Sequence, residues 1–420
     1  MPYGDGNRLA EALRTFLKSA APEKLAVTAF ERMAKEGEEP ARVFCLGKAA
    51  PALARAAEAV WPGVPGFLYG TSPHGKAPRA WIELYGDHPN PTAGNLRRTR
   101  EVRAWLERGS GPLLACVSGG GSALLVEPRP PWTLQEKAAA TALLIQRGAT
   151  IGEINAFRAR LSTVKAGGLL GSVRPWPVLT AIWSDVGANQ GRLVSSAPTL
   201  PWRSRESAEA VAARYDLRLA RPLPEPGPKV CAVRGDRWMV LFDALALRRL
   251  VAARLREEGY GIVEMLVPEG LHAGRLAEKI AERFFGQRSR APLAVVGTGE
   301  ATVVARGAAG RGGRCSHLAA ALALEMEERS EKRPWLFAAL ATDGVDGSGG
   351  AGAFTDSTHA PPSSELRAAL ERCDTGRLWE RRGGLLARKP TGNNLRDLWV
   401  LADGPCTPAG ANRCEEEDRP

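Results

Sequence analysis

The sequence predicts an α/β protein built from two units, each a layered sheet with mostly parallel strands. Short apolar runs alternate along the chain with longer segments whose apolar residues recur at helical spacing. Polar or glycine-rich loops follow nearly every apolar run, as they follow the strands of parallel α/β sheets. The length of 420 residues exceeds one ordinary core, which favours two domains.

Composition is typical of soluble globular proteins. Hydrophobic residues make up 44% of the chain and charged residues 25%, and no apolar stretch approaches the length of a membrane span. The first residues lack the charged-then-apolar pattern of a secretory signal, so we expect a cytoplasmic protein that binds no membrane. The seven cysteines form no C-x-x-C pair and the five histidines are dispersed, which argues against a disulfide framework and a zinc site.

The net charge of +11 fits an anionic partner. The arginines are scattered and often stand near glutamates, as Arg254 and Arg256 do beside Glu257 and Glu258. No basic block is interleaved with aromatic residues, so we expect no nucleic acid. The expected partner is a small anionic molecule, and a homodimer stays open.

The first domain is expected over residues 1–225 as a Rossmann-like α/β unit. Helical spacing covers 7–36, with a break near Pro22. The other expected elements are strands over 43–46, 82–84, 113–117 and 177–183 and helices over about 50–60, 95–108 and 133–147. In such a sheet the loops that follow the strands gather on one edge, where ligands bind.

Two loops of this domain are candidate anion sites. Gly47 and Lys48 stand between a strand and a helix start, where the ammonium group and the helix N-terminus point the same way. The order differs from a Walker A loop because Ala49 replaces its Ser or Thr. The second loop has three glycines that let N–H groups face a cavity and two serines that add hydroxyl donors. It consists of Ser118, Gly119, Gly120, Gly121 and Ser122. A solvated lysine and an ordinary glycine turn are the structural alternatives.

More polar side chains follow in the first domain. Asn155 and Arg158 are three residues apart on one helical face, with Lys165 on its continuation, and a solvated polar face is the alternative. Asp185 follows the strand over 177–183, where α/β sheets place ligands, although it could also cap a turn. His88 lies in a proline-fixed loop and is interpreted as structural.

Prolines accumulate between Pro201 and Pro228, and the domain boundary is expected there. The second α/β domain is expected over 229–405, followed by an acidic tail over 406–420. Its expected elements are strands over 229–233, 261–267, 292–296, 336–341 and 398–402 and helices over 244–258, 274–285 and 318–328.

The loops of the second domain carry a different set of groups. The run from Gly297 to Glu300 is an incomplete dinucleotide fingerprint, because its third glycine is absent. Arg314 stands between a glycine turn and a helix start, a good geometry for phosphate. Asp343 and Asp346 could hold Mg²⁺, position a hydroxyl or accept its proton. An exposed, flexible glycine loop is the alternative at Arg314.

Two sheet edges that face each other across a cleft would bring these loops together. The cleft would hold Lys48, the loop from Ser118 to Ser122, Asp185, Arg314 and Asp343. This set has cations, backbone donors and carboxylates but no nucleophile–histidine pair. Phosphoryl transfer needs this mixture, because its catalysis is mostly positioning and charge stabilisation.

The ordered motifs resemble those of the glycerate 2-kinase family, which carries a C-terminal MOFRL domain and is often named as hydroxypyruvate reductase. The resemblance covers nearly the whole chain. It is carried by Gly47–Ala50, Asp87–Pro89, Ser118–Ala123, Asn155 with Arg158 and Lys165, Ser184–Val186, Gly299–Glu300, Gly312–Arg314, Thr342–Gly347 and Gly392–Asn394.

The resemblance implies transfer of the γ-phosphoryl group of ATP to the 2-hydroxyl of D-glycerate, giving 2-phosphoglycerate with Mg²⁺. It also implies two unequal α/β/α domains around a cleft, with the last strand a candidate to return to the first domain. Lys48 and Arg314 would neutralise the transferring group, Asp343 would orient or deprotonate the hydroxyl, and Asp185 would hold the metal. The implied phosphate, nucleotide or substrate contacts are Ser118–Ser122, Asn155, Arg158, Lys165, Glu300, Asp346 and Asn393.

Two segments depart from the family pattern. Gly187–Gly191 replace a run with further aspartates, and Cys315–His317 replace Asn-Gln-Glu. These departures keep open a divergent homologue that is weakly active or only binds ligand. The α/β class and the loop at Gly297 keep open a second alternative, an NAD(P)H-dependent hydroxypyruvate reductase.

Overall fold

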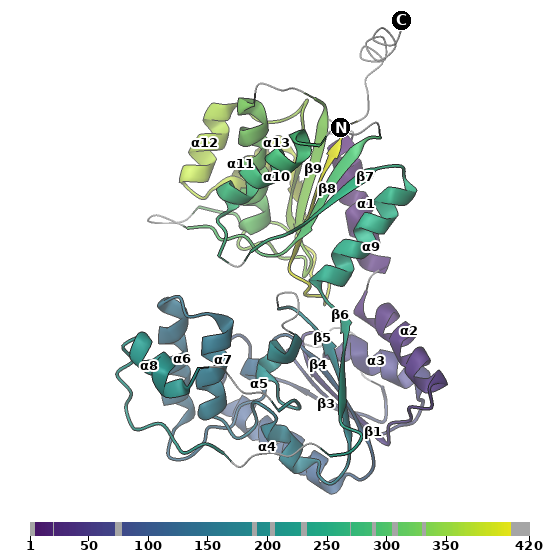
Figure 1. Cartoon of the computed structure of the whole chain (residues 1–420), viewed down its shortest axis with the longest axis vertical. Helices are drawn as coiled ribbons and strands as arrows, with labels where there is room; N and C mark the ends of the chain where they lie inside the picture. Colours follow the sequence, from purple (N-terminus) through teal and green to yellow (C-terminus); the bar gives the residue numbers. More distant parts are fainter. Residues whose placement is uncertain are drawn as a thin grey trace, which may run out of the picture. The chain divides into compact units, whose positions relative to one another are not determined.

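The computed structural model describes residues 5–19, 21–71, 78–186, 191–201, 206–227, 233–268, 270–287, 291–304, 310–329 and 333–404. The chain forms two compact units, each with its own sheet (Figure 1). The N-terminal unit is Ala21–Asp243, and the C-terminal unit joins Met1–Ala20 to Ala244–Pro420. The predicted α/β class is confirmed. No helix in the described part of the chain is long and apolar enough to cross a membrane.

The sheet of the N-terminal unit is parallel throughout, in the order β3-β2-β1-β4-β5-β6. Its strands are β1 (Arg42–Gly47), β2 (Gly66–Gly70), β3 (Ile82–Tyr85), β4 (Leu113–Ser118), β5 (Val178–Trp183) and β6 (Arg237–Phe242). The chain crosses from β3 back past β1 to reach β4, so β1 and β4 are central neighbours. Such a reversal of strand order is where open α/β sheets bind ligands.

Strands β1 and β4 are buried along their whole length, because helices cover both faces of this sheet. Helices α2 (Pro22–Lys35) and α3 (Ala50–Val60) lie on one face, and α4 (Ala93–Arg108) and η1 (Gly168–Ser172) pack on the other. Short helices α5 (Gly121–Leu124) and η2 (Gly191–Ser196) sit at the ends of β4 and β5.

Three further helices form a small cluster beside the sheet: α6 (Leu134–Gln146), α7 (Ile151–Arg160) and α8 (Ala208–Arg214). Thr133 and Thr150 begin α6 and α7 with capping boxes, each threonine exchanging hydrogen bonds with a glutamate three residues on. Trp132, Leu144, Phe157 and Val211 are among the buried residues that hold the cluster together.

The C-terminal unit has a mixed sheet in the order β11-β10-β9-β12-β8-β7. Its strands are β7 (Gly261–Leu266), β8 (Leu293–Thr298), β9 (Trp335–Ala341), β10 (Gly352–Asp356), β11 (Leu385–Leu386) and β12 (Asp397–Asp403). β12 inserts antiparallel between β8 and β9, and β10 runs antiparallel to its neighbours. The expectation of a mostly parallel sheet therefore holds fully in the N-terminal unit, while the C-terminal sheet is mixed.

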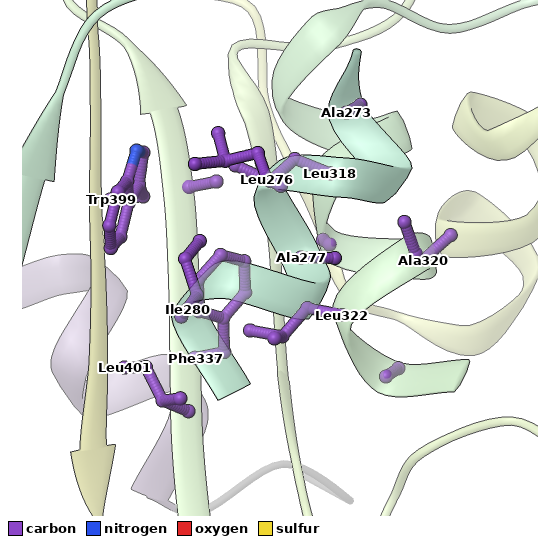
Figure 2. Close-up of a cluster of buried hydrophobic side chains, with 14 of the residues drawn as sticks. Ala273, Leu276, Ala277, Ile280, Leu318, Ala320, Leu322, Phe337, Trp399 and Leu401 are labelled. Carbon is purple, nitrogen blue, oxygen red and sulfur yellow. The ribbon is translucent and has the colours of Figure 1, made fainter. Parts of the chain in front are cut away.

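Helices cover both faces of this second sheet as well. α1 (Asp5–Ser19) and α9 (Ala244–Glu257) pack on one face, and α10 (Ala273–Phe285) and α11 (Arg314–Glu328) on the other, with α12 (Ser363–Glu371) and α13 (Thr375–Arg382) beside α11. Figure 2 shows the core of that second face, where Leu276, Ile280 and Leu322 of the helices meet Phe337 and Trp399 of the strands.

The domain boundaries differ from the expected ones in three respects. The first helix belongs to the C-terminal unit, because its buried side chains pack on β9 and β10. Residues 237–242, expected in the second domain, form the edge strand β6 of the first sheet. The last strand stays in the C-terminal sheet between β8 and β9 and does not return to the first domain. The expected strand over 229–233 and the acidic tail fall almost wholly outside the described residues.

Candidate functional site

The predicted site residues fall into two groups, one at the carboxyl ends of the strands in each unit. In the N-terminal unit the loop after β1 is joined to the loop after β4. The N–H of Lys48 donates to the carbonyl of Gly119 over 2.8 Å. Gly47 has a φ of +104°, and a Cβ there would lie 2.5 Å from Ser118 O, so this close approach requires glycine.

Ser118 holds this junction together with its side chain. Its hydroxyl donates to Leu46 O over 2.8 Å and accepts from the N–H of Ala49 over 3.0 Å. The side chain is 1% exposed. Both hydrogen-bonding functions of the hydroxyl are therefore used between the two loops, so Ser118 acts as a support for the site.

The glycines after Ser118 allow charged side chains to approach the backbone. A Cβ on Gly119 would overlap Oδ2 of Asp185, and a Cβ on Gly120 would lie 3.2 Å from Cγ of Lys48 and 3.4 Å from Cδ2 of His88. Lys48, His88 and Asp185 thus surround the glycine loop. Burial, and then the charge of Lys48, lower the pKa of His88. His88, interpreted as structural from the sequence, also lines the pocket that opens beside this loop.

Ser122 and Asn155 belong to one hydrogen-bonded chain. The hydroxyls of Ser122 and Ser196 lie 2.8 Å apart, and Ser196 donates to Oδ1 of Asn155 over 2.7 Å. Lys165 donates to the carbonyls of Ser122 and Ser195 over 3.0 and 3.4 Å. These contacts fix the glycine loop against η2.

The turn at the end of η2 is strained. Ser195, Ser196 and Ala197 have φ values of 51°, 59° and 54°, a left-handed conformation that costs non-glycine residues energy. Ser195 Oγ donates to Ser118 O over 2.6 Å, which helps to hold this conformation against the loop. Neither Ser195 nor Ser196 carries a sequence signal that would have identified it as part of the site.

A pocket of about 700 Å³ opens beside these groups. Its described lining includes three cationic side chains, Lys137, Arg158 and Lys165, and one carboxylate, that of Asp185. Burial and the charge of Arg158 lower the pKa of Lys137 to about 7, and burial and the charge of Lys137 lower the pKa of Lys165 well below its usual range. Burial and mutual repulsion thus disfavour the charged forms of these two lysines, and an anion in the pocket would favour them.

Lys137 was missed by the sequence reasoning, which took 133–147 only as a helix. A signal was present: Lys137, Thr141 and Leu144 stand at helical spacing, and all three are buried. A lysine on the apolar face of a helix is unusual, so this spacing could have identified Lys137 as a candidate site residue.

The second group of residues surrounds Arg314, the first residue of α11. Its guanidinium pairs with Glu300 at 2.9 Å and with Asp397 at 3.1 Å. Burial opposes the charge of Arg314, but Asp397 and Glu300 outweigh it and raise the arginine pKa. Burial, with Glu300 and Asp346, raises the pKa of Asp397 to about 7 against the opposing charge of Arg314. Asp397, at the start of β12, was not predicted from the sequence.

The two predicted aspartates after β9 differ in role. Asp346 is 3% exposed and accepts from the N–H groups of Cys315 and Ser316 over 2.9 and 2.8 Å. It therefore caps the N-terminus of α11 from outside the helix. Asp343 is half-buried, and its Oδ1 accepts from the N–H of Val345 over 3.0 Å.

Asn393 lies in the loop between β11 and β12, which is hydrogen-bonded to Thr342, directly after β9. Its N–H donates to Oγ1 of Thr391 over 3.1 Å, and Thr391 Oγ1 donates to Thr342 O over 2.5 Å. Among the residues that the structure describes, no three His, Cys, Asp or Glu side chains form a group that could hold a metal ion. Gly187–Gln190 of the divergent segment after Asp185 fall outside the described residues.

Comparison with known proteins places the chain among relatives over both units. The DUF4147 family, a domain of unknown function, matches residues 8–225, and the MOFRL family matches residues 293–397. An Agrobacterium vitis protein named "Putative hydroxypyruvate reductase" is 32% identical over 384 residues, covering 85% of this chain and 86% of that protein. The D-glycerate 2-kinase of Thermotoga maritima is 29% identical over 388 residues, covering 85% and 89%.

The fold has a close counterpart among solved structures. The crystal structure of a glycerate kinase from Thermotoga maritima matches with a TM-score of 0.80 at 23% identity, covering 95% of this chain and 99% of that one. At this identity the match shows the fold alone. Taken with the two family matches and the sequence relatives, it confirms the resemblance seen in the motifs. The chain belongs to the glycerate 2-kinase family.

Proposed function

We propose that the protein is an ATP-dependent kinase that phosphorylates the 2-hydroxyl of D-glycerate to 2-phosphoglycerate. The observation that carries the proposal is the pocket of the N-terminal unit, where the glycine loop meets Lys137, Arg158 and Lys165 and a single described carboxylate. A phosphoryl donor brings several negative charges, and fixed cations with backbone N–H groups are what stabilise them during transfer.

The choice of acceptor is supported by the relatives. The Thermotoga maritima protein is named a D-glycerate 2-kinase, which indicates both the acid and the position of the hydroxyl. Glycerate is a small hydroxy acid with one carboxylate, so it needs few contacts beyond a cation for that group.

Lys48 and Asp185 are proposed to act next to the donor. Lys48 follows β1 directly, and its side chain runs beside Gly120, so its ammonium group is within reach of a phosphate on the loop. Asp185 packs against Gly119 on the other side. Mg²⁺ in kinases uses one or two carboxylates and otherwise phosphate oxygens and water, so an aspartate beside the loop fits this ion. Bound there, Mg²⁺ would offset phosphate charge.

Arg314 is proposed to have a different role from the phosphate contact expected from the sequence. Arg314 already balances the charges of Glu300 and Asp397, so its positive charge is not freely offered to a phosphate. We propose that Arg314 keeps these carboxylates in place, and that Glu300 and the half-buried Asp343 are the groups that contact the acceptor. A carboxylate near the hydroxyl would orient it and accept its proton.

The reductase alternative is disfavoured by the geometry of the loop at Gly297. A Cβ on Gly297 would overlap the ring of Trp399, and one on Gly299 would lie 2.7 Å from Cβ of Val267. These glycines make room for neighbouring side chains, whereas a dinucleotide fingerprint uses them to approach a pyrophosphate. Within the described residues the next helix, α11, begins only at Arg314, so no described helix N-terminus opens directly from this loop.

The test is incubation of the purified chain with Mg²⁺, ATP and D-glycerate. We expect ADP and a product whose phosphorus couples to a single CH proton in ³¹P–¹H NMR, as in 2-phosphoglycerate, whereas the 3-isomer would show coupling to a CH₂ group. Lys48→Ala should abolish turnover, and the exposed Lys35→Ala on α2 should not. No ADP with glycerate or related hydroxy acids would refute the proposal, and oxidation of NADH or NADPH by hydroxypyruvate would favour the reductase.

A further inference from the structure

The buried ammonium group of Lys137 has no role within the described protein. The side chain is 5% exposed, and among the described residues no acceptor lies within hydrogen-bonding distance of its Nζ. The nearest acidic influence is Glu127, but Glu127 accepts from Arg103 over 2.6 Å and from Thr163 over 2.5 Å. A buried lysine without a partner either destabilises the protein or loses its proton, unless a bound anion compensates for its charge.

Lys137 shares the pocket with two more cations. Arg158 is half-buried and forms no ion pair with the described residues, and its charge lowers the pKa of Lys137. Lys165 donates from its ammonium group to Ser122 O and Ser195 O and lines the same pocket. Three basic side chains that repel one another when charged are therefore gathered, and the described lining of the pocket has one carboxylate, that of Asp185. A multiply charged anion would relieve this repulsion.

The pocket also has an apolar side, supplied mainly by the same helix. Ala138, Ala142 and Ile145 of α6 line it, and Ile145 is 56% exposed. Leu134 and Ile151 extend this lining. Small residues and one exposed isoleucine form an apolar strip next to the basic side chains, which suits the ring of a base.

We propose that this pocket is the nucleotide site, in which Lys137 and Arg158 bind the polyphosphate and the strip on α6 packs against the base. The inference rests on the proposed kinase function and assigns its donor to the N-terminal unit. Glycerate fits this pocket poorly, because it is a three-carbon acid with one negative charge. A volume of about 700 Å³ and three cations suit a larger and more highly charged ligand.

The polyphosphate half is tested with Lys137→Met, which keeps the length of the side chain and removes its charge. We expect tripolyphosphate and ATP to bind about tenfold to a hundredfold more weakly by calorimetry, the range for losing a charged hydrogen bond. Without ligand, the variant should melt several degrees above wild type, because an unpaired buried charge has gone. Lys24→Met, exposed on α2, should change neither value.

A structural lysine would behave in the opposite way. If Lys137→Met melts below wild type and binds tripolyphosphate and ATP as wild type does, the proposal is wrong. A variant that keeps ATP affinity but raises the KM for glycerate would assign the subsite to the acceptor and would also overturn it.

The base half is tested on the apolar strip. Ile145→Asn should weaken ATP about tenfold and leave tripolyphosphate unchanged, because only ATP carries a base. Leu143→Asn is the matched control, since Leu143 is 38% exposed on the same helix but does not line the pocket. Equal effects of the two variants on ATP would refute the strip as the base site.

The binding assays need no turnover, so they separate this inference from the kinase proposal. If the chain makes no ADP with glycerate but loses tripolyphosphate affinity in Lys137→Met, the acceptor is wrong and the site stands. If ADP forms normally and the Lys137 and Ile145 variants bind ATP like wild type, the kinase stands and the site is wrong.

Discussion

Replacing Asp346 with alanine should destabilise the C-terminal unit strongly, although the residue was predicted from the sequence as a ligand contact. Its two carboxylate oxygens accept from the N–H groups of Cys315 and Ser316, which are 1% and 0% exposed. An ordinary N-cap contributes about 1 kcal/mol, but here two buried N–H groups would lose a charged acceptor. We estimate a loss of about 3 kcal/mol.

For a unit of this size, about 3 kcal/mol corresponds to a fall in Tm of about 6–12 °C. Differential scanning calorimetry of the full chain measures the shift, and hydrogen exchange with mass spectrometry locates it. The amides of the first turns of α11, Arg314–Glu328, should lose protection first.

Asp343→Ala is the matched control in the same loop. Asp343 is half-buried and its carboxylate accepts a backbone hydrogen bond from the N–H of Val345, so its loss should cost about 1 kcal/mol or less. A wild-type Tm for Asp346→Ala, or a larger loss for Asp343→Ala, would refute the assignment of Asp346 as the cap of α11.

Two further predictions concern stability. Lys48→Ala should change the free energy of unfolding by less than about 0.5 kcal/mol, because alanine keeps the backbone hydrogen bond between the two loops. Arg314→Ala should cost about 2 kcal/mol, because it leaves Asp397 unpaired. Equal losses of the two variants in urea unfolding would contradict this. Burial opposes the ionisation of Glu153, but hydrogen bonds from Thr150, Arg214 and Tyr215 outweigh it and lower its pKa to about 2. Its contribution is therefore present above pH 4.5 and lost as the pH falls through about 2, so Glu153→Gln should flatten acid unfolding followed by circular dichroism, and an unchanged acid profile would argue against it.

Many elements of the fold were predictable because their sequences are locally unambiguous. The buried runs at β1, β4, β5 and β8 carry the continuous apolar pattern of central strands. Strands β2, β6, β10 and β11 were missed. β2 is a five-residue segment bounded by glycines, and β6 was hidden by the domain boundary assumed before it, although Arg237–Phe242 is rich in apolar residues.

The candidate site was predictable only where a motif marks a strand end. Lys48, the glycine loop and Asp185 follow β1, β4 and β5, so their placement at one edge follows from parallel topology. The roles of Ser118 and Asp346 were not predictable, because both are defined by bonds to segments far away in the chain. Lys137 was missed for a related reason, since a lysine in a helix is usually solvated.

The sequence alone determined the α/β class, the order of the loops and the family, because each depends on local periodicity or on motifs read in order. Tertiary structure decided which residues share a pocket and which side chains remain available. Arg314 shows the difference: its position beside a glycine turn suggested a phosphate contact, but Glu300 and Asp397 approach it from separate segments and balance its charge. Charge balance depends on distances between segments, and only the folded chain sets those distances.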